Sequence, residues 1–172
     1  VSALPGSDSK GDPARGQAGG MPPMKEEIRA ARPEDLAAVF SLEKACFSDP
    51  WSRALLEKSL TDQTLFLIAC AEEKPAGYFL GALVLDELQI FRVAVDPAFR
   101  RKGIGRSLLT EAVKRSGAAL AFLEVRASNA GAIALYRSCG YEEIGVRKNF
   151  YTAPREDAVM MKWEWTHENS GN

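Results

Sequence analysis

Histidine is almost absent from the sequence, which has His167 alone, and cysteine is limited to Cys46, Cys70 and Cys139 without a CxxC pair. Because His167 lies in a polar end segment, a histidine-based zinc site, a Ser-His-Asp triad and a Cys-His dyad are excluded. We therefore expect no metal, and a catalytic acid or base must be of another residue type. Three cysteines without a pairing pattern favour reduced thiols that pack in the interior, and so a cytoplasmic protein.

Neither sign of charge is in excess. The sequence has 22 Lys and Arg residues and 23 Asp and Glu residues, and the net charge is −1. No overall field attracts nucleic acid, so we expect no direct nucleic-acid partner, and any basic site must be a local cluster. No apolar run is long enough for a signal peptide or a transmembrane helix, so we expect no membrane partner. With 172 residues, 46% hydrophobic and 26% charged, the chain fits one globular domain.

Large apolar side chains are scarce at both ends of the chain. Residues 1–24 are rich in Gly, Pro, Ser and Asp, and they bury too little apolar surface to offset the entropy of ordering. We predict a disordered tail or an added extension there, with Met21 or Met24 as the natural start because the sequence begins with Val1. Residues 166–172 form a second predicted tail, so the predicted domain spans 25–165.

Between the tails, the spacing of apolar residues predicts a mixed α/β order of elements. A short strand, EEIRAA, precedes two helices, of which the first begins at Pro33 and the second after Asp49-Pro50. Three apolar runs at 64–72, 75–85 and 88–96 predict consecutive antiparallel strands. The spacing of apolar residues next predicts a helix from Ile104 to Gly117, a strand LAFLEVRA that is buried on both faces, and a helix from Asn129 to Cys139. YEEIGVR and DAVMMKWEW are the last two predicted strands.

A cluster of three cations, Arg100, Arg101 and Lys102, stands directly before Gly103-Ile104-Gly105 and a predicted helix. Glycine permits positive φ and a close approach of a ligand, and the first-turn N–H groups of a helix lack intrahelical partners. These features predict an anion cradle that suits a pyrophosphate. A solvated basic turn is the alternative, because a short glycine motif alone is weak evidence.

The run VAVDPAFRRKGIGRSLL resembles the acetyl-CoA signature of the Gcn5-related N-acetyltransferase (GNAT) superfamily, R/Q-x-x-G-x-G/A, through Arg100, Gly103 and Gly105. More narrowly, LEVRASNAGAIALYRSCGY, RKNFY and REDAVMM resemble the RimI-type ribosomal-protein alanine N-acetyltransferases. The resemblance covers about Lys25 to Trp165 and includes the order of the elements. It implies an α/β fold with a mixed, mostly antiparallel central sheet that has helices on both faces, and acetyl-CoA as cosubstrate.

Position by position, the resemblance assigns residues to acetyl-CoA. It implies that the backbone of Val93, Ala94 and Val95 holds the pantetheine arm like an added strand, and that Asn129 contacts the same arm. The pyrophosphate would be wrapped by six consecutive residues, chiefly through their backbone amides: Arg101, Lys102, Gly103, Ile104, Gly105 and Arg106.

Two residues are candidates for the proton transfers of acetyl transfer. Glu124 lies in an otherwise apolar strand, where burial would strengthen it as a base; an ion pair with Arg126 or another cation is the alternative. Tyr136 lies on the apolar face of its helix, so it could be a core aromatic, although a phenol suits protonation of a leaving thiolate. The family resemblance favours Glu124 as proton acceptor and Tyr136 as proton donor.

Two predicted loops are candidates for the acceptor side. CFSDPW, at 46–51, joins the first two helices, and KNFYTAPRED, at 148–157, joins the last two strands. In N-terminal acetyltransferases these loops flank the peptide slot, which implies substrate contacts for Phe47, Trp51 and Tyr151; ordinary loop packing is the alternative. Glu156 and Asp157 are expected to attract a basic peptide.

The resulting prediction is an enzyme that transfers acetyl to the N-terminal α-amine of a ribosomal protein, with alanine as the terminal residue of a small-subunit protein. A small amine or an antibiotic is the nearest alternative acceptor. A non-catalytic acyl-CoA-binding module is a second alternative, although such a module would need neither Glu124 nor Tyr136. A monomer is expected.

Overall fold

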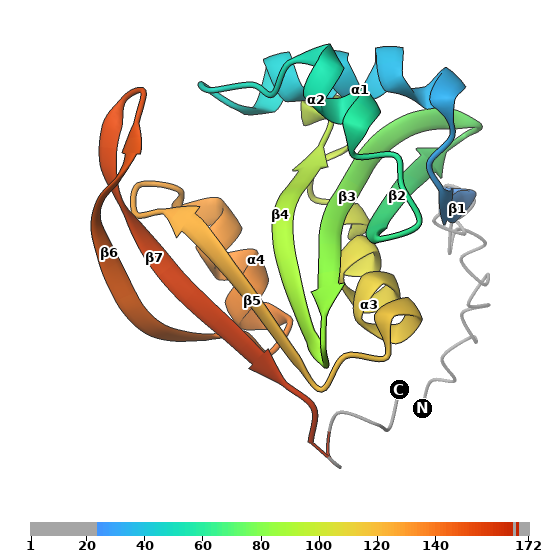
Figure 1. The fold of residues 1–172 in the computed structure, drawn as a ribbon. Coiled ribbons are helices and arrows are strands. Elements are labelled where there is room, and N and C mark those ends of the chain that lie inside the picture. Colours follow the sequence, from blue (N-terminus) through green and yellow to red (C-terminus); the bar gives the residue numbers. More distant parts are fainter. Residues whose placement is uncertain (1–23, 167, 169–172) are drawn as a thin grey trace, which may run out of the picture.

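The computed structural model describes residues 24–166 and 168 (Figure 1), so the predicted tails lie outside the described residues except for 24, 166 and 168. The sequence forms seven strands, four α-helices and two 3₁₀ turns in the described part. Their order is β1 (Glu26–Ala30), η1 (Pro33–Asp35), α1 (Leu36–Cys46), α2 (Arg53–Lys58), β2 (Thr64–Ala71), β3 (Lys74–Val84), β4 (Glu87–Val95), η2 (Pro97–Phe99), α3 (Ile104–Ser116), β5 (Leu120–Arg126), α4 (Ala130–Ser138), β6 (Glu142–Thr152) and β7 (Arg155–Glu164).

All seven strands lie in one sheet in the order β1-β2-β3-β4-β5-β7-β6. Every neighbouring pair is antiparallel except β4 and β5, which are parallel. The chain leaves β4, forms α3, and returns as β5, which is the crossover that a parallel pair requires. The predicted mixed, mostly antiparallel sheet is confirmed.

Helices cover both faces of the sheet (Figure 1). Successive residues of β2 and β3 point to opposite sides, so each face of the sheet has its own apolar core under the helices. Phe66, Ile68 and Leu80 pack under α1 and α2. Leu67 and Phe79, each next to one of these in the sequence, pack against α3. Strands buried on both faces require the continuous apolar runs that predicted them.

The sheet opens between β4 and β5 (Figure 1). The two strands pair only where Glu87–Gln89 meets Leu120–Phe122. From Ile90 onward, no described strand pairs with β4 on this side. The sheet is therefore split into two halves that are joined at one end, with an unpaired edge of β4 along the opening.

This opening corrects the expectation that β5 is buried on both faces. Ala121, Leu123 and Val125 are buried, but Glu124 is exposed. Because β5 diverges from β4, the face of β5 that carries Glu124 borders the opening instead of a packed layer.

The second correction concerns 148–157, which was expected to be a loop. β6 continues to Thr152 and β7 begins at Arg155, so most of this segment belongs to a β-hairpin. Tyr151 pairs with Glu156 and Thr152 with Arg155. The polar residues of this edge hairpin carry no apolar alternation, which is why their pattern indicated a loop.

Candidate active site

A cavity of about 720 Å³ occupies the opening between β4 and β5. It is lined by parts of both strands, the α1–α2 loop, the start of α4 and the β6–β7 hairpin. The cavity brings together seven of the predicted site residues, which are Phe47, Trp51, Val93, Glu124, Asn129, Tyr136 and Tyr151. Segments as far apart in the sequence as Phe47 and Tyr151 thus meet at one place, as a two-substrate site requires.

Tyr136 lies on α4 at the wall of this cavity. Its side chain is buried, and its ring lies 5.8 Å from the ring of Tyr141. Burial raises the pKa of the Tyr136 phenol above its usual value of 10. The phenol is therefore protonated throughout the neutral range, as a proton donor must be.

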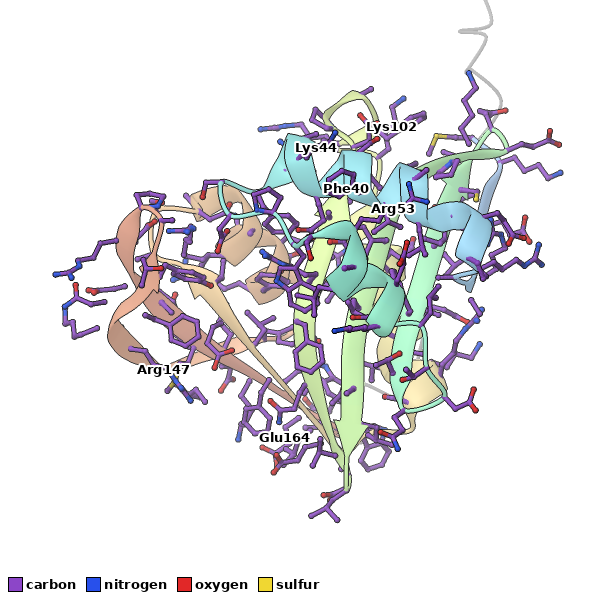
Figure 2. All side chains as sticks on the ribbon, turned by 45° about the horizontal axis from the view of Figure 1, so that its top comes forward. Phe40, Lys44, Arg53, Lys102, Arg147 and Glu164 are labelled. Carbon is purple, nitrogen blue, oxygen red and sulfur yellow. The ribbon has the colours of Figure 1, made fainter. Side chains whose placement is uncertain are left out.

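Glu124 projects from β5 into the same cavity. Its side chain is 34% exposed, and its Oε1 lies 3.7 Å from Nη2 of Arg147. Arg147 belongs to β6 (Figure 2). The expectation that Glu124 is buried is wrong. The alternative was an ion pair with Arg126 or another cation, and the cation in contact with Glu124 is Arg147. Glu124 is reachable by water, so a bridging water can connect it to an amine.

Arg126, two residues after Glu124 on β5 and on the same face of the strand, holds the β6–β7 hairpin in place. Its guanidinium donates hydrogen bonds to the carbonyl oxygens of Pro154 (2.9 Å) and Ala153 (3.1 Å) and lies 3.3 Å from Glu156. The guanidinium carbon is 4.2 Å from the centre of the Tyr151 ring. Burial raises the pKa of Tyr151, so this phenol is also neutral.

The α1–α2 loop and the β6–β7 hairpin meet over one end of the cavity. The Ser48 hydroxyl donates to the carbonyl oxygen of Ala153 at 3.3 Å. Asp49 Oδ1 lies 3.7 Å from Nη2 of Arg126.

Glu156 and Asp157 are engaged within the molecule. Glu156 accepts from the backbone N–H of Ser128 at 2.6 Å, and hydrogen bonding from Ser128, then Arg126, lowers the pKa of Glu156. Asp157 accepts from the N–H of Asn149 at 2.8 Å and pairs with Lys148, which lowers its pKa. The expected attraction of a basic peptide by these two carboxylates is therefore not supported.

The predicted anion cradle lies between β4 and α3. Asp96 caps η2 by accepting from the N–H of Ala98 at 2.8 Å. Arg101 has φ 61° and Gly103, at the N-cap of α3, has φ 86°. No side chain in the described part caps this N-terminus. The first-turn N–H groups of α3 therefore remain available to an anion.

Several predicted cofactor residues have side chains with structural contacts. Ala94 and Ile104 are buried in the two cores, and the Val95 carbonyl accepts from Nε of Arg100 at 3.2 Å. A Cβ on Gly105 would lie 2.8 Å from Leu135, so this glycine allows α3 to approach α4. Other contacts in this region are those of Arg106 with Ser138, at 3.0 and 2.9 Å, and of Lys102 with the Phe99 ring.

Asn129 caps α4 by accepting from the N–H of Ala132 at 3.1 Å, and it still lines the cavity. The fit to acetyl-CoA thus rests on the backbone: an unpaired edge of β4, a left-handed turn after it and an uncapped helix N-terminus.

Arg92 was missed by the sequence reasoning. It lies on β4, lines the cavity, and is 10% exposed at its side chain. A cation inside the apolar run LQIFRVAV was the available signal, because a buried charge requires a partner.

The residues between 24 and 166 include no group of three or more His, Cys, Asp and Glu side chains that could hold a metal ion. The three cysteines are free thiols; Cys70 is buried, and Cys46 and Cys139 are half-buried. No helix in the described part of the chain has the length and apolar character needed to cross a membrane.

The split sheet, the cavity in its opening and the uncapped start of α3 are the features expected of an acetyltransferase of the GNAT type, and the sequence comparison agrees with this class. Residues 36–141 match the acetyltransferase (GNAT) family, and the chain belongs to this family. The predicted resemblance is therefore confirmed.

Within the GNAT family, the chain is similar to several named N-acetyltransferases. The "[Ribosomal protein bS18]-alanine N-acetyltransferase" of Escherichia coli (strain K12) is 38% identical over 139 residues, which are 78% of this chain and 94% of that protein. The crystal structure of the ribosomal-protein-S18-alanine N-acetyltransferase from E. coli matches with a TM-score of 0.75 and 36% identity, over 84% of this chain and 98% of that one. Arabidopsis thaliana NAA60 in complex with acetyl-CoA shares the fold, with a TM-score of 0.75 at 18% identity over 82% of this chain and 100% of that one.

The chain is thus an acetyl-CoA-dependent N-acetyltransferase, as predicted.

Proposed function

We propose that this enzyme acetylates the N-terminal α-amino group of a ribosomal protein, with alanine as the terminal residue of a small-subunit protein. The E. coli relative carries this activity in its name. In the structure, the observation that supports a chain terminus is the contact between the α1–α2 loop and the β6–β7 hairpin through Ser48 and Ala153. A terminal amine can enter a cavity that is closed at this end, whereas an extended chain could not pass through it.

The chemistry requires that the attacking ammonium lose a proton and that the departing thiolate gain one. Acetyl-CoA supplies the acetyl group as a thioester. In our proposal, Glu124 accepts the amine proton, directly or through a water, and Tyr136 donates a proton to the thiolate sulfur. Both side chains line the same cavity, and the Tyr136 phenol holds its proton at neutral pH because burial raises its pKa.

The acceptor would be held by Phe47, Trp51 and Tyr151, and the donor by the backbone of Val93, Ala94 and Val95 with Asn129. The pyrophosphate would lie on the turn formed by Arg101, Lys102, Gly103, Ile104, Gly105 and Arg106, where the backbone N–H groups at the start of α3 supply hydrogen bonds and the helix dipole favours negative charge.

A matched pair of glycines tests this cradle. Gly103 and Gly117 stand at the two ends of α3, both have positive φ, and a Cβ at either would meet no described atom within 4 Å. Replacing either by alanine should cost about 1–2 kcal/mol of unfolding free energy, because alanine is strained in this conformation. Only Gly103→Ala should also weaken CoA binding, by roughly tenfold, because relaxation of its backbone turns the N–H groups away from the pyrophosphate.

Isothermal titration calorimetry with CoA and urea unfolding of both variants measure the two effects separately. An unchanged affinity in Gly103→Ala, or an equal loss of affinity in Gly117→Ala, would show that the pyrophosphate lies elsewhere.

Mass spectrometry tests the acceptor. The enzyme is incubated with acetyl-CoA and three sets of acceptors: peptides with free N-terminal alanine, the same peptides blocked at the N-terminus but containing lysine, and small amines including polyamines and aminoglycosides. We expect one added acetyl group on the α-amine of the first set only. Acetylation confined to the small amines would overturn the proposed function.

A further inference from the structure

We propose that Arg92 is a positioning residue for the acceptor: its buried guanidinium fixes the loop that carries Phe47 and Trp51, and thereby sets the affinity for the acceptor but not for acetyl-CoA. This inference rests on the proposed function, because it assumes that these two aromatic residues contact the acceptor.

The guanidinium of Arg92 contacts both aromatic rings. Its central carbon lies 4.1 Å from the centre of the Phe47 ring and 5.2 Å from the centre of the Trp51 ring. A planar cation attracts the faces of aromatic rings, and the attraction is stronger where water is excluded. Arg92 is 10% exposed at its side chain, so these contacts are largely desolvated.

Arg92 also holds the loop backbone at Asp49, which lies between Phe47 and Trp51 in the sequence. Nη2 donates to the carbonyl oxygen of Asp49 at 2.9 Å, and Nη1 lies 3.9 Å from the Asp49 carboxylate. One side chain therefore contacts three residues of the loop between α1 and α2: Phe47, Asp49 and Trp51.

A fully buried carboxylate completes the arrangement. Glu43, on α1, is 0% exposed, and its Oε1 lies 3.6 Å from Nε of Arg92. Its Oε2 accepts from the backbone N–H of Trp51 at 2.6 Å, and the Tyr78 hydroxyl donates to its Oε1. Breaking one side of such a buried pair is costly, so the geometry of the loop is tied to the core of the sheet.

The Arg92 side chain points toward the proposed acceptor residues and not toward the proposed acetyl-CoA residues. Along β4, Ala94 packs with α1 and α2, whereas Val93 packs against the other core. By the same alternation, Arg92 faces α1 and α2. The contacts of Arg92 described above come from α1 and the α1–α2 loop, and none of them comes from the turn at 101–106 or from Asn129.

Arginine is specifically needed here. In Arg92→Lys the charge that compensates Glu43 is kept, but lysine has no planar group to lie against two rings and cannot span Glu43 and Asp49 together. We expect Arg92→Lys to raise the KM of the acceptor peptide about tenfold, and Arg92→Met to raise it further. The KM of acetyl-CoA should change by less than about twofold in Arg92→Lys, because its proposed contacts lie elsewhere.

Steady-state kinetics with an N-terminal alanine peptide and acetyl-CoA measure the two KM values. Arg53→Lys is the control, since Arg53 lies on α2 (Figure 2) with a side chain that is 59% exposed and pairs with Glu57; neither KM should change. A parallel rise of both KM values in Arg92→Lys, or an unchanged acceptor KM, would overturn the inference.

A second measurement needs no acceptor. In a Trp163→Phe, Trp165→Phe background, Trp51 is the remaining tryptophan, and Arg92→Lys should make its fluorescence more readily quenched by acrylamide. Unchanged quenching would contradict the inference. If the unaltered enzyme acetylates no peptide, the proposed function fails, while the quenching result still decides whether Arg92 holds the loop.

Discussion

Replacement of Tyr136 by phenylalanine is expected to lower kcat by about 10²- to 10⁴-fold, the usual contribution of a general acid. The ring stays in place and fills the same volume, so packing against Tyr141 is kept. What disappears is the hydroxyl that donates a proton to the departing thiolate. The KM of acetyl-CoA should therefore change far less than kcat.

Tyr141→Phe is the matched control for this variant. Tyr141 is also a buried tyrosine, but its hydroxyl has no hydrogen-bond partner among the described residues, and it is not among the residues that line the cavity. Its replacement should leave kcat unchanged. An equal loss in both variants would show that packing of α4, and not the Tyr136 proton, sustains turnover.

The pH dependence supplies an independent check on Tyr136. Burial raises the pKa of this phenol above 10, so the proton is lost only at higher pH than for a free tyrosine. A group that acts in its protonated form then causes no fall in kcat between pH 7 and 10. A descending limb below pH 10 that disappears in Tyr136→Phe would show that this phenol loses its proton below pH 10, and would contradict the raised pKa.

Replacement of Glu124 by glutamine is expected to lower kcat by about 10²- to 10⁴-fold at pH 7, because the amide keeps the shape of the side chain but accepts no proton. An α-ammonium has a pKa of about 7.7–8.0, so the loss should shrink towards pH 10, where the free amine is already abundant. A loss of kcat in Glu124→Gln that is the same at pH 7 and at pH 10 would place the base elsewhere, because abundant free amine should compensate for a missing base.

Arg147→Gln separates catalysis from ion pairing at this site. Arg147 is 55% exposed and its Nη2 lies 3.7 Å from Glu124. If the carboxylate served mainly to pair with Arg147, either replacement would give the same result. We expect Arg147→Gln to retain kcat within several-fold, because exposed ion pairs contribute at most about 1 kcal/mol.

Local patterns in the sequence predicted the parts of the fold that depend on local interactions. The order of strands and helices followed from periodicity, and the ends of α3 followed from Gly103 and Gly117, whose left-handed conformations are a property of the residue itself. The resemblance to the GNAT family then named the site residues. Seven of them do meet in one cavity, which their positions in the chain alone could not show.

The error at Glu124 is caused by the separation of β4 from β5. Glu124 was expected to be buried because its strand is apolar, and it is exposed because the neighbouring strand diverges after Gln89. How far two strands stay paired depends on the helices packed against them, which no short stretch of sequence records.

By itself, the sequence determined the elements, because apolar periodicity and glycine conformations act over a few residues. The motifs that it shares with the GNAT family determined the family, the cosubstrate and the turn that we propose for its pyrophosphate. Only the tertiary structure decided which residues face each other across the opening. The Arg92–Glu43 pair, the closure of the loop by Ser48 and Ala153, and the contact of Gly105 with Leu135 all join distant segments. Their geometry depends on strand register and on helix packing, which are set by the whole core.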